Sequence, residues 1–214
     1  MKCTILDCDG TLYRYPNQNF LETRIWKSVR EHSIELIRKK GYKNPEKNFT
    51  HFFEKYNGEI SEAFEKELGI LKDTYFQHTW GALTPHEIVL QPQISPATLD
   101  ALLEITPNLA ILSNAPFPWI KRVLNYLGIS KYFHDNIWTG EGLIRKPLPE
   151  SYLQIAKALS IEPELMVMVG DEEKNDIKVP NKLGMTTVRI NPYNKKTLAN
   201  YQIDNINELP NAIK

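Results

Sequence analysis

Two carboxylates near the start of the chain have types and spacing that could do chemistry. Asp7 and Asp9 follow Cys3-Thr4-Ile5-Leu6, which reads as a short buried strand. Side chains alternate in extended chain, so both carboxylates are expected on one side, before Gly10 turns the chain. The two carboxylates repel each other unless a cation lies between them. Such a pair therefore indicates a bound metal or a paired acid/base function. An ordinary Asp-Gly-Thr turn is the alternative for these residues alone.

Other expected strands also end in polar residues. Runs 109–112 and 165–169 are apolar and read as buried strands, and a further loop precedes the helix expected at 149–159. In open α/β sheets the carboxyl ends of the strands form the ligand-binding edge. The polar residues that would gather there with the first pair are Ser113, Asn114, Lys146, Asp171 and Asp176.

This set of side chains suits phosphoryl transfer. An aspartate is ionised at neutral pH and can attack phosphorus directly, which gives an aspartyl-phosphate. Mg²⁺ prefers hard oxygen ligands and needs only one or two carboxylates beside the phosphate. A lysine adds positive charge, a hydroxyl holds phosphate oxygens, and a second carboxylate can protonate the leaving group.

The hydrophobic periodicity changes twice along the chain. Residues 20–80 look wholly helical, with expected helices at about 21–40, 46–56, 61–68 and 72–80 and many aromatic residues that would form a core. From residue 88 onward strands alternate with helices, which predicts a parallel sheet covered on both faces. We therefore expect an α/β, Rossmann-like core (1–14 and 88–214) and an all-helical cap (15–87) inserted after the first strand.

Composition excludes several classes of partner. The 214 residues carry 26 basic and 26 acidic side chains, so no net charge favours nucleic acid or an anionic membrane. No apolar run is long enough to span a bilayer, and no signal peptide is evident. Cys3 and Cys8, the two cysteines, read as buried apolar residues of a reducing compartment. A cytoplasmic location is expected.

Four motifs in order resemble those of the haloacid dehalogenase-like superfamily. The resemblance covers nearly the whole chain and implies a Rossmann-like core, with a cap similar to that of subfamily I and of its phosphatase branch. Pro180 departs from the alanine common in relatives and would shorten or kink the helix expected at 175–183. The matching segments are Asp7-Cys8-Asp9-Gly10-Thr11-Leu12, Ile111-Leu112-Ser113-Asn114, Lys146-Pro147, and Gly170-Asp171 with Asp176.

The resemblance also implies roles for single residues. Asp7 would be the nucleophile and a metal ligand, and Asp9 the general acid/base with its backbone carbonyl on the metal. The dehalogenase branch lacks the second aspartate, so the resemblance points to phosphate chemistry. Ser113 and Asn114 would bind phosphate. Lys146 would balance charge, bind phosphate and orient the nucleophile. Asp171 would bind Mg²⁺, and Asp176 would act at the metal through water or by holding Lys146.

These inferences lead to one main hypothesis and two alternatives. The chain would be a Mg²⁺-dependent phosphatase of a small phosphorylated metabolite, either a nucleotide monophosphate or a sugar phosphate. The cap would exclude water and select the substrate. A phosphomutase of the β-phosphoglucomutase kind and a non-catalytic interaction protein are the alternatives. Candidate substrate contacts are Tyr13, Arg14, Tyr42 and Lys43.

Overall fold

The computed structural model divides into two compact units. One unit comprises residues 1–15 and 89–214, and the other comprises residues 16–88. The structure describes residues 1–14, 23–88, 91–142, 144–190, 193 and 195–214. No helix in these described residues is long and apolar enough to cross a membrane.

The first unit is built on a six-stranded sheet in which every neighbouring pair is parallel. The strand order is β5-β4-β1-β6-β7-β8, so β1 lies in the middle between β4 and β6. This arrangement confirms the predicted α/β class. The strand bounds are β1 (Cys3–Leu6), β4 (Asn108–Leu112), β5 (Ile137–Trp138), β6 (Met166–Gly170), β7 (Thr186–Ile190) and β8 (Tyr201–Ile203).

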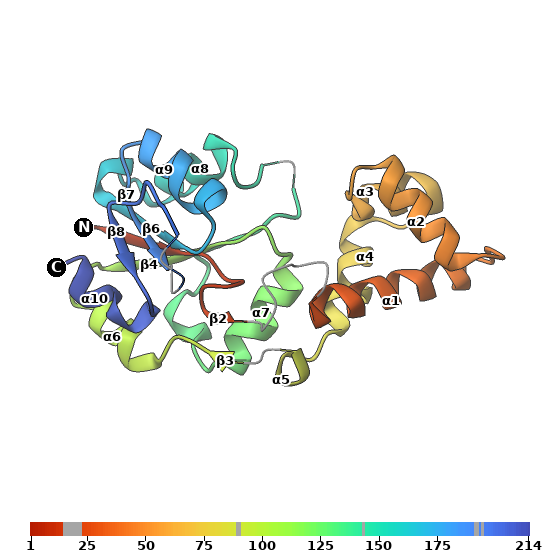
Figure 1. Cartoon of the computed structure of the whole chain (residues 1–214), viewed down its shortest axis with the longest axis horizontal. Helices are drawn as coiled ribbons and strands as arrows, with labels where there is room; N and C mark the ends of the chain where they lie inside the picture. Colours follow the sequence, from red (N-terminus) through yellow and green to blue (C-terminus); the bar gives the residue numbers. More distant parts are fainter. Residues whose placement is uncertain (15–22, 89–90, 143, 191–192, 194) are drawn as a thin grey trace. The chain divides into compact units, whose positions relative to one another are not determined.

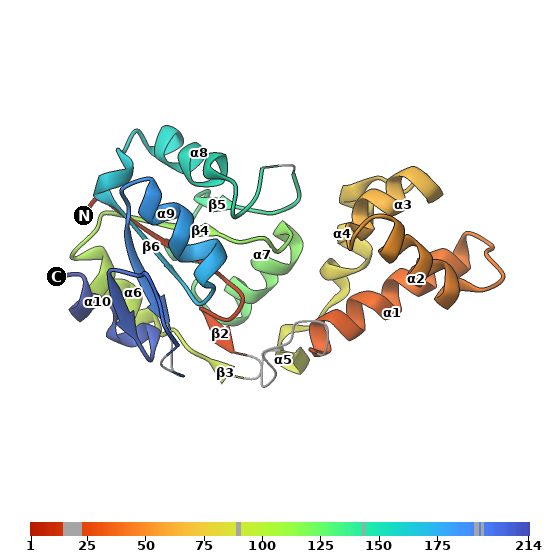
Figure 2. The ribbon, with the colours of Figure 1, turned by 45° about the horizontal axis from the view of Figure 1, so that its top comes forward.

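Helices cover both faces of this sheet, which explains why its central strands are apolar on both sides (Figures 1 and 2). On the face covered by α8 and α9, a core cluster joins Cys3 and Ile5 of β1 to Tyr152 and Ile155 of α8. The α6 and α10 helices lie on the opposite face. The helix bounds are α6 (Pro96–Leu103), α7 (Phe117–Tyr126), α8 (Pro149–Leu159), α9 (Val179–Lys182) and α10 (Leu209–Ala212).

The second unit is helical throughout its described part, as predicted for the insertion. Its core is a cluster of aromatic and aliphatic side chains that includes Phe52, Phe64 and Tyr75. Ser33 and Tyr75 share a buried hydrogen bond of 3.0 Å inside it. The helices are α1 (Arg24–Lys39), α2 (Pro45–Lys55), α3 (Ile60–Leu68), α4 (Lys72–His78) and α5 (Pro85–Ile88), with the single turn η2 (Trp80–Ala82) before α5.

Local sequence explains several helix ends. Ser95 caps α6 by accepting a hydrogen bond from the backbone N–H of Thr98, and Pro96 occupies the first turn. After α1, Gly41 takes the left-handed conformation that ends a helix. Both cysteines, Cys3 and Cys8, are free and buried, as predicted.

Three features differ from the sequence-based expectations. Tyr13–Arg14 (β2) pairs antiparallel with Gln91–Pro92 (β3), and β8 forms an edge strand of the main sheet. The segments β2, β3 and β8 are too short to show a recognisable strand pattern in the sequence. The helix expected at 175–183 is instead a π-helix, Glu173–Lys178 (η5), followed by α9. Pro180 has no N–H to donate to the carbonyl of Asp176, so one continuous α-helix cannot complete its hydrogen bonds there.

Candidate active site

The centre of the sheet brings the sequence-predicted side chains to one edge. Asp7 directly follows β1, and its backbone N–H still donates to Val169 of β6 (2.9 Å). Ser113 follows β4 on one side of β1, and Asp171 follows β6 on the other side. The strand order therefore places a hydroxyl and a second carboxylate on the two sides of Asp7.

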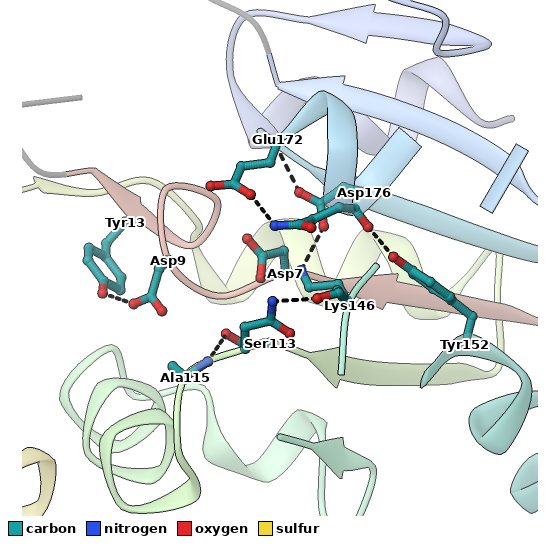
Figure 3. Close-up of polar contacts among 11 residues, drawn as sticks. Asp7, Asp9, Tyr13, Ser113, Ala115, Lys146, Tyr152, Glu172 and Asp176 are labelled. Carbon is teal, nitrogen blue, oxygen red and sulfur yellow. Dashed lines mark hydrogen bonds and ion pairs between the residues drawn. The ribbon is translucent and has the colours of Figure 1, made fainter. Parts of the chain in front are cut away.

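Lys146 lies between two of the carboxylates. Its Nζ donates to Oδ1 of Asp7 at 2.8 Å and to Oδ1 of Asp176 at 2.6 Å, and all three side chains are at least 92% buried (Figure 3). Burial lowers the pKa of Lys146, but the charges and hydrogen bonds of both carboxylates outweigh burial and leave this pKa above its usual value. Lys146 therefore carries a fixed positive charge beside the expected nucleophile.

Three carboxylates form a group that fits a metal ion. One oxygen each of Asp7, Asp171 and Asp176 lies within 4.8 Å of the others. Oδ1 of Asp171 is buried without a hydrogen-bond partner. Burial, and then the charges of Asp7 and Asp176, raise the pKa of Asp171 well above its usual value. A hard divalent cation would give the orphaned oxygen a partner and remove this cost, so the donor set fits Mg²⁺.

The backbone around Asp176 holds its carboxylate in place. Its Oδ2 accepts a hydrogen bond from the backbone N–H of Glu172 (3.0 Å), and the Tyr152 hydroxyl donates to the carbonyl of Asn175. Gly170 permits this approach, because a Cβ added there would lie 2.2 Å from Cγ and Oδ2 of Asp176. Burial raises the pKa of Asp176 and Lys146 opposes that effect. The π-helix thus turns Asp176 back over the end of β6.

The two residues after β4 have different surroundings. Ser113 is buried, and its Oγ accepts a hydrogen bond from the N–H of Ala115 (3.2 Å), which leaves its own hydrogen available to an oxyanion. Asn114, expected to bind phosphate, donates its side-chain N–H to the carbonyl of Lys146 (2.9 Å). In this structure the Asn114 amide therefore anchors the loop that carries the lysine.

Asp9 has separate partners. Its Oδ1 accepts hydrogen bonds from the Tyr13 hydroxyl and from Nε1 of Trp119 (3.0 Å), and it does not belong to the group of three carboxylates (Figure 3). The pKa of Asp9 is raised to about 6, and burial is the largest cause. The hydrogen bond from Tyr13 opposes this rise, whereas the charge of Asp7 adds to it. A carboxyl group with such a pKa can both give and accept a proton near neutral pH.

Sequence reasoning missed the residues that support these side chains. Arg189 of β7 is buried; its Nε donates to the carbonyl of Asp171 (3.2 Å), and its guanidinium pairs with Glu173 (2.9 Å). The signal was an arginine in the otherwise buried strand Thr186–Ile190, since a buried arginine requires a partner. Glu173 is that partner. No sequence pattern marks Trp119 or Tyr152.

The candidate substrate contacts divide between the two units. Tyr13 is fully buried and bound to Asp9, and Arg14 donates to the carbonyl of Asp204 (2.6 Å). Both side chains are thus used inside the first unit. Tyr42 and Lys43 lie in the second unit after α1 and are exposed.

The fold and this group of side chains define an α/β protein with aspartates and a lysine at the centre of the carboxyl edge of a parallel sheet. A family model described as haloacid dehalogenase-like hydrolase matches residues 1–184. The protein belongs to this family, as the four motifs predicted.

Two curated relatives are phosphatases. A phosphoglycolate phosphatase of Salmonella typhimurium is 33% identical over 124 residues, which are 58% of this chain and 48% of the relative. A glyceraldehyde 3-phosphate phosphatase of Methanopyrus kandleri is 33% identical over 96 residues, which are 41% of each protein. The chain thus matches less than half the length of either relative.

Solved structures share the fold over nearly the whole chain. A HAD phosphatase from Thermococcus onnurineus superposes with a TM-score of 0.68 at 25% identity and covers 99% of this chain and 97% of its own. A 2-haloacid dehalogenase from Pseudomonas syringae gives a TM-score of 0.66 at 22% identity with the same coverage. This second likeness concerns the fold alone, because one fold serves more than one chemistry.

Proposed function

We propose that the protein is a Mg²⁺-dependent phosphatase of a small phosphorylated metabolite. The observation that carries the proposal is the buried contact of Asp7 with Lys146, next to two further carboxylates that fit a cation. A carboxylate held beside an ammonium and a metal site can approach a phosphate dianion that would otherwise repel it. The phosphatase relatives support this choice over carbon–halogen cleavage, as does the second aspartate, Asp9.

In the first step, an oxygen of Asp7 attacks phosphorus and forms the aspartyl-phosphate. The bond from phosphorus to the leaving oxygen breaks, and Asp9 gives its proton to that oxygen. In the second step, Asp9 takes a proton from water, and the water oxygen attacks phosphorus and releases phosphate from Asp7. Lys146 keeps Asp7 oriented through its 2.8 Å hydrogen bond.

The remaining side chains bind the transferring group and the cation. The Ser113 hydroxyl, which already accepts a hydrogen bond, is placed to donate to a phosphate oxygen. Asp7 and Asp171 would hold Mg²⁺, together with the backbone carbonyl of Asp9, and Asp176 would act there through water or by holding Lys146. The bound ion supplies positive charge that neutralises the phosphate.

The test is phosphate release by the purified chain from a panel of phosphorylated compounds. The panel contains nucleoside monophosphates, sugar phosphates and small phosphorylated acids, each with Mg²⁺ and with EDTA. Release is expected only with Mg²⁺, and Asp7→Asn should abolish both release and covalent labelling by phosphate. The matched control is Asp135→Asn, which changes an exposed aspartate and keeps every proposed active-site residue.

Three results would contradict the proposal. Equal release in EDTA would exclude a role for the metal. Undiminished release by Asp7→Asn would exclude Asp7 as the nucleophile. Return of the phosphoryl group to a sugar, with no net phosphate, would identify a phosphomutase instead.

A further inference from the structure

Both hydrogen bonds that the described residues direct at the Asp9 carboxylate go to the same oxygen. Oδ1 accepts from the Tyr13 hydroxyl and from the Trp119 indole at 3.0 Å. The indole N–H also lies 3.2 Å from the Tyr13 hydroxyl oxygen, so the three side chains form a closed triangle. Tyr13 and Trp119 are fully buried, whereas Asp9 is partly exposed.

The two donors are buried and packed against each other. Their rings meet edge to face, with centroids 6.3 Å apart and planes at 83°. Tyr13 belongs to β2 and Trp119 to the first turn of α7, and Asp9 and Tyr13 are also joined by a backbone bridge. Two aromatic side chains from separate elements therefore fix the Asp9 carboxylate, and neither donor carries a charge.

We propose that Tyr13 and Trp119 are positioning residues for the general acid. This inference rests on the proposed function, because it takes Asp9 as the group that protonates the leaving oxygen. The two donors hold Oδ1, and no described residue is hydrogen-bonded to Oδ2, so Oδ2 is the oxygen left to exchange a proton with the substrate. Such orientation matters to proton transfer because a misplaced acid loses much of its rate advantage.

The competing explanation is that the aromatic pair only fills space in the core. The two explanations differ in what the polar atoms do, since packing needs only the rings. Tyr13→Phe removes one hydroxyl and keeps the ring, so it tests the hydrogen bond with the least disturbance. Trp119→Phe removes the N–H but also part of the ring, so it is read together with the first variant.

The experiment compares kcat/KM for two substrates that differ in the acidity of the leaving group. An aryl phosphate has a leaving group that departs without protonation, whereas an alkyl phosphate needs the acid. With the alkyl phosphate, Tyr13→Phe is expected to lower kcat/KM about tenfold or more, part of the ~10²–10⁴ that a general acid supplies. With the aryl phosphate the loss is expected to stay within about threefold.

The matched control is Tyr132→Phe. Tyr132 also donates to an aspartate, Asp100, at 2.8 Å, but it lies in η3 (Ser130–Tyr132), and Asp100 belongs to α6. This control should leave both substrates unchanged. Equal losses for the two substrates in Tyr13→Phe, or no loss for the alkyl phosphate, would overturn the inference while leaving the phosphatase proposal intact.

A second measurement tests the hydrogen bonds among Asp9, Tyr13 and Trp119 without any enzymatic turnover. The indole N–H of Trp119 gives an NMR signal that is identified by its loss in Trp119→Phe. This signal is expected to shift in Asp9→Asn and in Tyr13→Phe, and an unchanged signal would overturn the triangle itself. A wild-type chain that shows the contact but hydrolyses neither substrate would instead overturn the phosphatase proposal.

Discussion

Replacement of Asp171 by Asn should separate the binding of metal from the stability of the fold. Oδ1 of Asp171 is buried without a hydrogen-bond partner, and its neighbours Asp7 and Asp176 are also carboxylates. In the absence of metal, this charge is a cost to the folded state. Asp171→Asn is therefore expected to keep or raise stability in EDTA and to lose the stabilisation that Mg²⁺ gives the wild type.

The magnitude follows from the distances. Two carboxylate charges 4.8 Å apart repel by about 3.5 kcal/mol at an effective dielectric constant of about 20. Asp171 has two such neighbours, and the attraction of Lys146 offsets about one of them. The relief is therefore on the order of 3.5 kcal/mol for an ionised Asp171, and it shrinks toward zero to the extent that the raised pKa already leaves Asp171 protonated.

The assay is thermal unfolding in EDTA and at rising Mg²⁺ concentration. The wild type should gain about 2.7 kcal/mol at one hundred times Kd, which corresponds to roughly 5–11 °C in Tm for a chain of this size. Asp171→Asn should gain almost nothing, whereas the exposed control Asp135→Asn should gain as much as the wild type. A variant that loses more than ~1 kcal/mol in EDTA, or that keeps the full Mg²⁺ gain, would refute the reasoning.

Three further outcomes are expected. Gly170→Ala places a Cβ 2.2 Å from Asp176, so urea unfolding should show a loss of about 1–3 kcal/mol and the Mg²⁺ gain should fall; Gly142→Ala, whose nearest contact is 3.9 Å, should change stability by less than ~0.5 kcal/mol. Arg189→Met should weaken Mg²⁺ binding measured by calorimetry more than Arg189→Lys does, because it removes both the charge and the hydrogen bond to the carbonyl behind the metal site. Burial raises the pKa of Tyr75, so the unfolded chain ionises first and stability should fall above pH ~10; Tyr75→Phe should make the decline of Tm between pH 9 and 11 less steep, and an identical slope would contradict that reasoning.

The sheet and the order of its polar ends could be predicted because they depend on strong local signals. The strands β1, β4 and β6 consist mostly of apolar residues, and α8 begins at Pro149 and ends before a left-handed Ser160. Each of these signals is contained in a few neighbouring residues. The gathering of Asp7, Ser113 and Asp171 at one edge followed once the strand ends were assumed to share it, whereas the pairing of Lys146 with Asp7 was implied only by the family resemblance.

The supporting contacts could not be predicted, because they join residues that are distant in sequence. Trp119 reaches Asp9 across 110 positions, and no periodicity or cap signal marks an indole that will donate to a carboxylate. The π-helix after β6 was missed for a different reason. A helical pattern at 175–183 specifies an apolar face but not how many residues each turn contains, and only Pro180 pointed to an interruption.

Strand order explains why the two aspartates of the first motif have different surroundings. Asp7 still belongs to the ladder of β1, since its N–H donates to β6, so its carboxylate must face the charges delivered after β6 and by Lys146. Two residues later the chain has left the sheet, because Gly10 turns it with a φ of +81°. A Cβ at Gly10 would lie 2.5 Å from Oδ2 of Asp171, so this turn lies directly beside the group of three carboxylates. Asp9 is thereby directed to neutral aromatic donors instead of a cation. One short segment thus supplies a carboxylate that pairs with an ammonium and a second carboxylate that accepts from two neutral donors.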